Sequence, residues 1–83
     1  MIISHFENLR RRKEYRESRD LSVRTISEET RLSQGAILRV KNATMARISL
    51  STLEALCRYF EVKALNNLIE YVPELNHDGA AAE

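Results

Sequence analysis

The sequence predicts an all-α fold, a compact five-helix bundle. Apolar residues in the C-terminal half recur at i, i+3, i+4 and i+7, which is the period of an amphipathic helix. Of the 83 residues, 43% are hydrophobic, two are Gly and one is Pro, so the turn residues of a sandwich or barrel are scarce. A chain of this length can bury one modest core. We expect one domain over residues 1–75 and a C-terminal tail over residues 76–83.

The first helix is expected to carry the densest basic run of the chain. That run consists of Arg10, Arg11, Arg12, Lys13 and Arg16. Because Glu14 and Glu17 are interleaved with it, the default interpretation is a solvated helix face, and contact with phosphate is the alternative. The spacing from Leu9 to Leu21 predicts either an extended first helix or a loop around residues 18–20.

The second and third helices are predicted from two serines that can cap them. Ser22 precedes a helix that runs to about Glu29, and Ser33 precedes one that runs to about Lys41. A serine hydroxyl at such a position accepts from an unpaired backbone N–H of the first turn. The apolar positions Ile26, Ile37 and Val40 predict a core shared by the two helices, and the polar Gln34, Arg39 and Lys41 are expected outside it.

The fourth and fifth helices are predicted from apolar periodicity. The two sets are Leu53, Leu56, Cys57 and Phe60, and then Leu65, Leu68, Ile69 and Val72. Ser51 with Glu54 forms a candidate capping box for the fourth helix, and Pro73 is expected to stop the fifth. Both apolar faces should close the core beneath the second and third helices.

The stretch LSVRTISEETRLSQGAILRVKN at residues 21–42 resembles the helix-turn-helix of the Cro and phage-repressor (Xre) family. RISLSTLEALCRYFEVKALNNLIEYVP at residues 47–73 resembles the closing helices of its small, single-domain bacterial members. The resemblance covers residues 3–73 and implies a lambda-repressor-like DNA-binding domain. Three positions depart from the pattern. Arg31 stands where the family turn has Gly, Val23 where many relatives contact phosphate through Gln, and Gly35 where a base-reading side chain is common.

The resemblance implies a recognition helix at about Ser33 to Lys41 that lies in the major groove of double-stranded DNA. The candidate base-reading residues are Gln34, Gly35, Ala36 and Arg39. A Gln amide can bond adenine N6 and N7, an Arg fork can bond guanine O6 and N7 or a phosphate, and an Ala methyl can touch a thymine methyl. The alternative for Gln34 and Arg39 is an exposed polar side chain, and for Gly35 and Ala36 plain packing.

The candidate phosphate-binding residues are Thr25, Ser33, Asn42, Thr44 and Arg47. They lie at helix starts and in the loop after the recognition helix, where short polar groups and backbone N–H groups can hold phosphate. For the hydroxyl groups, capping a helix is favoured over phosphate contact. Such contacts set the register on the duplex without reading its sequence.

The charge is unevenly distributed along the chain. Residues 1–47 contain 11 Lys and Arg and 6 Asp and Glu, net +5, whereas residues 48–83 contain 2 and 6, net −4, which gives +1 overall. The basic half contains the helix-turn-helix. This polarity would orient that half towards phosphates, and binding that rests on it should weaken with salt.

A homodimer is expected, and its candidate contacts are Leu65, Ile69, Tyr71, Val72 and Leu75. Such a dimer would read two half-sites about 34 Å, or a multiple of that, apart. We expect repression through promoter occlusion, because that mechanism needs only occupancy. We also expect no separate ligand-sensing domain, so that regulation would come from protein concentration, a partner or proteolysis.

Other function classes are disfavoured by the sequence. A domain this small has little room for an active site, and it contains no phosphate loop or nucleophile–base arrangement, so we expect no enzyme and no cofactor. His5 and His77 lack metal-ligand spacing. Cys57, the single cysteine, is expected to be an inert buried thiol. Without a membrane-spanning run or a signal peptide, we expect a cytoplasmic protein, bacterial or phage-encoded and nucleoid-associated when bound.

The alternative is a protein-interaction module, such as an antitoxin or adaptor, that uses the same fold with DNA binding secondary. Val23, Gly35 and the small net charge favour it. Both functions fit one scaffold, since a fold does not determine a function.

Overall fold

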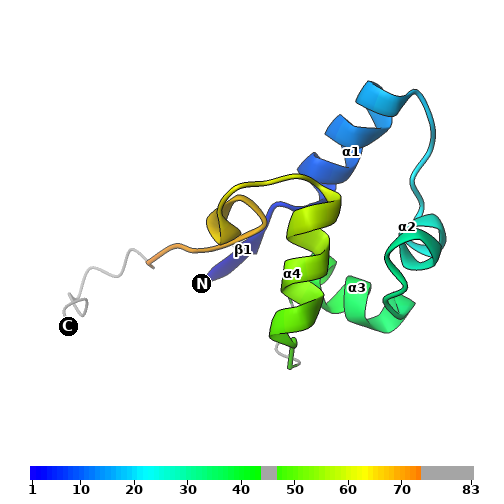
Figure 1. Ribbon diagram of the computed structural model, residues 1–83. Coiled ribbons are helices and arrows are strands. Elements are labelled where there is room, and N and C mark those ends of the chain that lie inside the picture. The colour runs from blue at the N-terminus through cyan, green and yellow to red at the C-terminus, as the bar shows by residue number, and fades with distance from the viewer. Residues whose placement is uncertain (44–46, 74–83) are drawn as a thin grey trace.

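The computed structural model describes residues 1–43 and 47–73, so the predicted boundary at residue 75 and the tail beyond it lie outside the described residues. The elements in chain order are β1 (Ile2–Ser4), α1 (Phe6–Glu17), α2 (Val23–Thr30), α3 (Gln34–Asn42), α4 (Leu50–Tyr59), the 3-10 turn η1 (Leu65–Asn67) and β2 (Ile69–Tyr71) (Figure 1). The described part of the chain is therefore mainly helical, with four α-helices and one small sheet. The helical class is confirmed, but the count of five helices is not.

The predicted fifth helix over residues 65–72 is wrong. Only one 3-10 turn forms there, closed by the N–H of Leu68 on the carbonyl of Leu65 at 2.8 Å, and the chain then extends into β2. Leu68 is fully buried whereas Leu65 is 49% exposed, so their spacing does not mark one helical face. Two consecutive Asn residues in η1 favour a turn, and the Ile and Tyr of β2 favour a strand. Pro73 consequently stops no helix.

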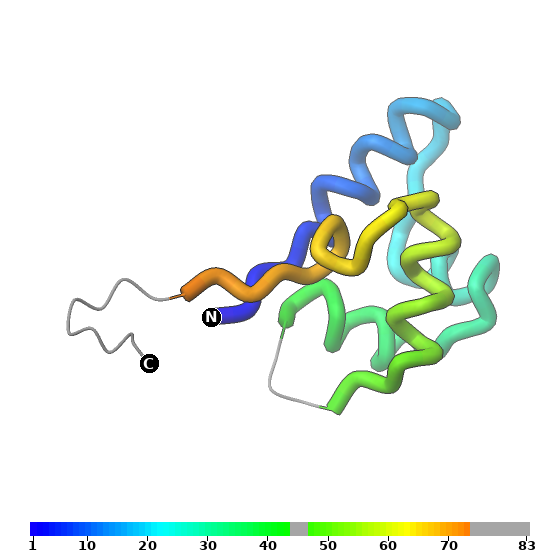
Figure 2. Tube along the Cα trace, turned by 60° about the vertical axis from the view of Figure 1, so that its left-hand side comes forward, coloured from blue at the N-terminus to red at the C-terminus, as the bar shows by residue number. Residues whose placement is uncertain are grey.

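The sheet joins the N-terminal strand to the last described strand. β1 and β2 are antiparallel, with Ile2 opposite Tyr71, Ile3 opposite Glu70 and Ser4 opposite Ile69. The pairing continues beyond the strands, because Met1 and Val72 exchange two backbone hydrogen bonds of 2.7 and 2.8 Å. In Figure 2 the first and last described segments accordingly run side by side. The sheet anchors the beginning of α1, whose first residue follows β1 after one connecting residue.

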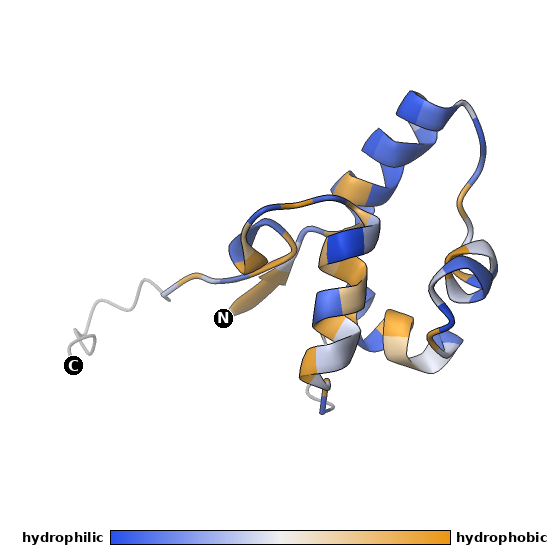
Figure 3. Cartoon of the chain, in the orientation of Figure 1, coloured by the Kyte–Doolittle hydropathy of each residue, from blue (hydrophilic) through white to orange (hydrophobic). Residues whose placement is uncertain are grey.

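One hydrophobic core lies between the helices and the sheet. Its buried members are Phe6, Leu9, Leu21, Ile26, Ile37, Val40, Leu53, Leu56, Phe60 and Leu68. The rings of Phe6 and Phe60 meet edge to face with their centroids 5.4 Å apart, which is a favoured aromatic geometry. Figure 3 shows that α1 is hydrophilic beyond its first turns. That helix therefore contributes mainly its N-terminal part to the core.

Three serines begin the helices that follow α1. Ser22, Ser33 and Ser49 each accept a 3.1 Å hydrogen bond from a backbone N–H three residues later. The predicted caps of α2 and α3 are confirmed. The predicted capping box of Ser51 with Glu54 is wrong, because α4 begins two residues earlier, with Ser49 as its N-cap. α4 therefore begins earlier in the sequence than the predicted capping box indicates.

A connection over residues 18–22 accounts for the long spacing before α2. α1 ends at Glu17, and Ser18 follows in the left-handed conformation with φ 54°. The carboxylate of Glu14 accepts the N–H of Leu21 at 2.7 Å, and Leu21 is fully buried. The loop alternative is therefore the one the structure adopts.

A polar cluster ties α1, α2 and α4 together. The Tyr59 hydroxyl and the Arg19 guanidinium both donate to the Glu29 carboxylate, at 2.7 and 2.9 Å. Lys13 is 7% exposed, pairs with Glu17 at 2.8 Å, and lies 4.6 Å from the centre of the Tyr59 ring, within the range of a cation–π contact. These contacts fix how α2 sits on the rest of the domain.

Candidate nucleic-acid interface

The turn between α2 and α3 is closed by hydrogen bonds around Arg31. Arg31 adopts φ 66° and ψ 19°, the left-handed conformation that glycine adopts most easily. Its N–H donates to the Ser27 carbonyl at 2.8 Å, and the Ser27 hydroxyl donates to the Leu32 carbonyl at 2.6 Å. The N–H of Leu32 also donates to the Thr30 hydroxyl oxygen at 3.2 Å. The turn thus keeps a helix-turn-helix geometry without glycine.

The two faces of α3 differ sharply in exposure. Ile37 and Val40 are fully buried in the core that α3 shares with α2, as the sequence predicts. With about 100° per residue, the opposite face is centred on Gly35 and Asn42. The exposed residues of this outer face are Gln34, Gly35, Leu38, Arg39 and Asn42. Two of the four candidate base-reading residues, Gln34 and Arg39, therefore project side chains from one exposed surface.

Gly35 and Ala36 occupy different environments. A Cβ built on Gly35 would meet no atom within 4 Å, so open space lies in front of the helix at this point. Ala36 is half-buried and turns towards the start of α4. Leu38 is 39% exposed and is not among the residues predicted from the sequence. It lies one turn after Gln34 and about 100° around the helix from Ile37, and this position indicates that it is exposed.

Lys41 is directed towards α1. Its Nζ lies 3.5 Å from Oε2 of Glu7, and its side chain is only 33% exposed. Lys41 therefore lies outside the hydrophobic core, as the sequence predicts, but its side chain is half-buried and paired with α1. The hydrogen bond from Arg10 lowers the pKa of Glu7, and Lys41 contributes to the same effect. A carboxylate that stays charged in turn holds the end of α3 against α1.

A hollow of about 580 Å³ lies between α3 and the start of α4. Its lining consists of Ala36, Arg39, Arg47, Ile48, Ser49 and Thr52. Among the described residues, Arg39 and Arg47 have no carboxylate within 4.0 Å, while most other arginines do. Two free guanidinium groups beside the N-terminus of a ten-residue helix suit a phosphate group.

The other candidate phosphate-binding residues surround this surface. Ser33 and Asn42 are exposed at the two ends of α3, and Thr25 is half-buried in the first turn of α2. The hydroxyl oxygens of Thr25 and Ser22 lie 3.1 Å apart, and the Ser33 hydroxyl caps α3. Thr44 lies outside the described residues. The capping role expected of Ser33 is confirmed.

Most of the basic run on α1 is already paired with carboxylates. Arg10 contacts Glu7 at 2.6 Å and Glu14 at 2.9 Å, and Arg16 lies 3.9 Å from Glu61. Lys13 is held in the polar cluster described above. Arg11 and Arg12 alone in this run have no such partner among the described residues. These ion pairs favour the default interpretation of a solvated helix face over contact with phosphate.

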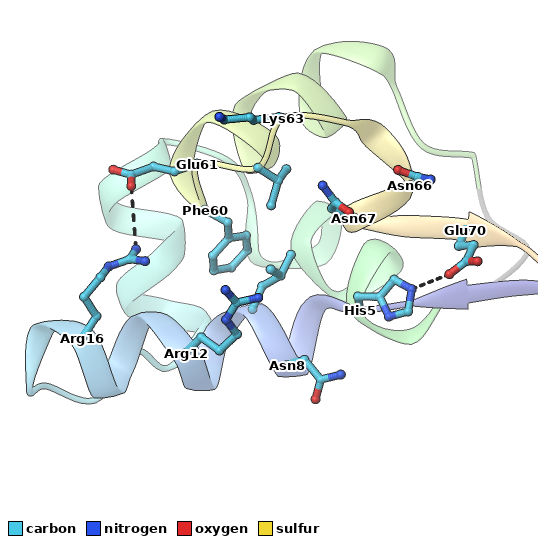
Figure 4. A pocket seen from close by; sticks show the side chains of 12 residues that line it. His5, Asn8, Arg12, Arg16, Phe60, Glu61, Lys63, Asn66, Asn67 and Glu70 are labelled. Carbon is cyan, nitrogen blue, oxygen red and sulfur yellow. Dashed lines mark hydrogen bonds and ion pairs between the residues drawn. The ribbon is translucent and has the colours of Figure 1, made fainter.

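A second hollow, also of about 580 Å³, lies away from α3. Figure 4 shows it between α1 and the segment from Phe60 to β2. Its polar lining holds His5 and Glu70, joined at 2.8 Å, and Arg16 with Glu61. No residue of α2 or α3 contributes to it. It is therefore separate from the surface that carries Gln34 and Arg39.

The candidate dimer residues lie at the sheet end of the molecule. Leu65 is 49% and Tyr71 67% exposed, whereas Ile69 and Val72 are half-buried. Leu75 lies outside the described residues. Across the sheet, Ile2, which is 50% exposed, lies opposite Tyr71, and Met1, which is 59% exposed, pairs with Val72.

The remaining candidate groups have structural surroundings. Cys57 is half-buried against the core, and burial raises the pKa of its thiol, which disfavours the reactive thiolate. Within residues 1–43 and 47–73, no three His, Cys, Asp or Glu side chains are grouped to hold a metal ion. No helix in the same part of the chain has the length and apolar character to cross a membrane. His77 lies outside the described residues.

Comparison with protein families gives a match over most of the chain. Residues 11–74 match the model of the Cro/C1-type HTH DNA-binding domain. Neither the curated proteins nor the solved structures contain a match. The matched segment begins within α1 and includes the capped α2 and α3, the turn at Arg31, α4 and β2. The chain therefore belongs to the Cro/C1-type helix-turn-helix DNA-binding family.

Proposed function

We propose that this protein is a sequence-specific transcriptional repressor that reads the major groove of double-stranded DNA with α3. The observation that carries the proposal is the division of α3 into a fully buried face, with Ile37 and Val40, and an exposed face, with Gln34 and Arg39. An α-helix fits the major groove, where the four base pairs present different donors and acceptors. The exposed face is thus free to meet base edges while the core holds the helix.

The two polar side chains of the outer face have distinct base preferences. The Gln34 amide matches adenine N6 and N7, and the Arg39 guanidinium matches guanine O6 and N7. Gly35 and Ala36 complete the candidate base-reading set through close backbone approach and a methyl contact. Each good bidentate pair discriminates against a wrong base by about 1–3 kcal/mol.

Phosphate contacts would fix the position of α3 on the duplex. We assign them to the hollow beside Arg47, to the exposed Ser33 and Asn42, and to Thr25 and Thr44. The hollow would place one phosphate beside Arg47 and the start of α4, and leaves Arg39 for base reading. Phosphate contacts of this kind orient a protein and carry no base preference.

Selection from a randomised duplex pool, followed by sequencing of the retained fraction, tests the proposal. The wild type should enrich a motif, and Gln34→Ala and Arg39→Ala should each weaken binding or relax the preference at one position. Asn66→Ala and Arg58→Ala are matched controls, because these exposed residues lie on η1 and α4. If no motif is enriched, or if the controls change it as much as the two α3 variants, the proposal fails.

A reporter assay distinguishes repression from activation, because a repressor of this kind needs only to occupy the promoter. A promoter that carries the enriched motif between its polymerase contacts should lose output in a reporter strain when the protein is expressed. Gln34→Ala should restore that output. Increased output with the wild type would instead mean activation, and the repressor part of the proposal would be wrong.

We assign homodimer contacts to the sheet end, through Leu65, Ile69, Tyr71, Val72 and Leu75. Met1 and Val72 form a hydrogen-bonded pair. Since hydrogen-bonded and non-hydrogen-bonded pairs alternate in an antiparallel sheet, the backbone groups of Ile69 and Tyr71 point to the outer edge of β2. An open edge beside exposed apolar side chains is suited to pairing with another strand. A symmetric dimer would present two copies of α3 to two half-sites.

Light scattering after gel filtration tests the dimer. One chain weighs 9.6 kDa, so the wild type should give twice that mass, and Tyr71→Lys should shift it towards the monomer. Tyr15→Lys is the matched control, since Tyr15 is 89% exposed on α1. A monomeric wild type at high concentration, or equal effects of both variants, would exclude this interface.

The second candidate function is that of an antitoxin or adaptor, in which the apolar sheet end docks another protein. The exposure of Met1, Ile2, Leu65 and Tyr71 together favours this candidate. It predicts a stable complex with one copurifying protein that Tyr71→Lys abolishes and Gln34→Ala leaves intact. The repressor proposal predicts the opposite sensitivity for DNA binding.

A further inference from the structure

The outer face of α3 contains one large apolar side chain, Leu38. It stands one turn after Gln34 and one turn before Asn42, both exposed, and is itself 39% exposed. The neighbouring Ile37 and Val40 are fully buried and belong to the core, whereas Leu38 does not. Packing within the domain therefore does not explain a leucine at this position.

A single exposed leucine is common on a protein surface, so the exposure of Leu38 alone does not indicate a function. Its location on the helix does. It lies about 100° around the helix from Ile37 and shares a face with the side chains to which we assign base reading. Beside it, Gly35 leaves open space in which a Cβ would meet no atom within 4 Å. The bare backbone lets this part of α3 approach a surface closely, and Leu38 would then be covered by that surface.

The major groove offers one apolar group on its base edges, the C5 methyl of thymine. The other edge groups are donors and acceptors, and an apolar side chain that covers them removes their water without replacing the hydrogen bonds. We infer that Leu38 is a specificity-determining residue that reads a thymine methyl in the same half-site that Gln34 and Arg39 contact. This inference rests on the proposed function, because it requires α3 in the major groove.

Leu38 fits this role better than Ala36, the other apolar residue near the outer face. Ala36 is half-buried and lines the hollow with Ile48 and Thr52, so its methyl is partly covered by the domain itself. Leu38 presents a longer side chain with two methyl groups. The expected preference is for thymine over cytosine and over uracil at one position of the half-site.

Replacement of thymine by deoxyuridine tests the inference, because it removes the methyl and keeps the pairing. The probes are duplexes with the motif enriched from the randomised pool, each with one thymine replaced. At one position the wild type should bind the uracil duplex about three- to five-fold more weakly, as one buried methyl predicts. Leu38→Ala and Leu38→Gln should bind both duplexes equally. Melting followed by circular dichroism checks that both variants are folded.

Leu50→Ala is the matched control, since Leu50 is 81% exposed at the start of α4. It should keep the preference for thymine over uracil whatever its overall affinity. The inference is overturned if the wild type ignores every thymine methyl, or if Leu38→Ala keeps the preference. Should Gln34→Ala and Arg39→Ala still relax the motif in that case, the proposed function stands and Leu38 alone is misassigned. If no motif is enriched at all, both fall together.

Discussion

At the scale of single residues, Arg31 shows how local hydrogen bonds permit an unfavourable backbone. A non-glycine residue in the left-handed conformation costs about 1–2 kcal/mol, and Arg31 has φ 66°. Ser27 and Thr30 supply hydroxyl groups that bond the backbone on both sides of it. The hydrogen bonds of Ser27 and Thr30 therefore stabilise the turn between α2 and α3, whereas the backbone conformation of Arg31 destabilises it.

We predict that Arg31→Gly stabilises the protein by about 0.5–1 kcal/mol. Glycine removes the left-handed strain, and its larger freedom in the unfolded chain offsets part of the gain. Arg31→Ala is the control, because alanine keeps the strain and should leave stability nearly unchanged. Chemical denaturation measures both variants. Equal stabilisation by alanine would attribute the effect to loss of the guanidinium and would contradict this explanation.

Glu29 makes stability depend on pH in the acid range. The hydrogen bond from Arg19, followed by that from Tyr59, lowers the pKa of Glu29 from 4.5 to about 2. A pKa lowered by folding contributes stability that is present above the unfolded value and is lost as pH falls through the folded value. The free energy of unfolding of the wild type should exceed that of Glu29→Gln above pH 4.5, and the difference should shrink as the pH falls to about 2. A constant difference between pH 6 and pH 2 would contradict the assignment.

At the scale of elements, the caps decide where helices begin. Ser49→Ala should destabilise the protein by about 1 kcal/mol, because it removes the acceptor for the Thr52 N–H at the start of α4. Ser51→Ala should cost much less, since Ser51 lies inside the helix and caps nothing. Thermal melting of the two variants compares them directly. A larger loss from Ser51→Ala would mean that α4 begins where the sequence pattern placed it.

The sequence predicts α2, α3 and α4 well because each has a serine before an apolar period. Ser22, Ser33 and the pair Ile37 and Val40 carry short-range signals that decide the local structure. The contrast is the segment from Leu65 to Val72, where apolar spacing suggests a helix and the chain forms a turn and a strand. β2 forms because β1 supplies its hydrogen-bond partners. The outer pair of this register, Ile2 and Tyr71, is 69 positions apart in the sequence. A long-range partner of this kind leaves no mark on local periodicity.

In the candidate site too, the sequence predicts what depends on neighbouring residues and misses what depends on contacts between distant helices. The sequence predicts that Gln34 and Arg39 are exposed, because the nearby apolar pair Ile37 and Val40 marks the buried face of α3. Lys41 also lies outside the core, as the sequence predicts, but its contact with Glu7 of α1 at 3.5 Å is long-range and has no local signal. The hollow between Arg39 and Arg47 was not foreseen, since it requires the packing of α4 against α3. The exposure of Leu38 follows from the predicted core face of Ile37 and Val40, although its apolar character alone indicates a buried residue.

At the scale of the whole molecule, pairing with carboxylates determines which basic residues can meet DNA. The basic run of α1 is largely neutralised by Glu7, Glu14 and Glu17, whereas Arg39 and Arg47 have no such partner among the described residues. The field that orients the protein should therefore come from the α3 and α4 surface. The N-terminal half has a net positive charge, but only some of its basic side chains lack a carboxylate partner among the described residues.

We predict that Arg47→Ala weakens binding to all duplexes by a similar factor and lowers the slope of log affinity against log salt by about one. A phosphate contact releases a counterion and reads no base. Arg58→Ala should leave the slope unchanged, because Arg58 is paired with Glu54 at 2.8 Å. Fluorescence anisotropy over a series of salt concentrations gives both slopes. A sequence-dependent loss in Arg47→Ala would reassign that residue to base reading.

The proposed function depends most on contact between α3 and base edges in the major groove. The measurement that tests it most directly is the affinity for motif duplexes in which one purine at a time is replaced by its 7-deaza analogue, which lacks the N7 acceptor. The wild type should lose affinity at one adenine and one guanine of the half-site, and Gln34→Ala and Arg39→Ala should each abolish one of these losses. Full affinity of the wild type for every 7-deaza duplex would contradict major-groove reading by α3.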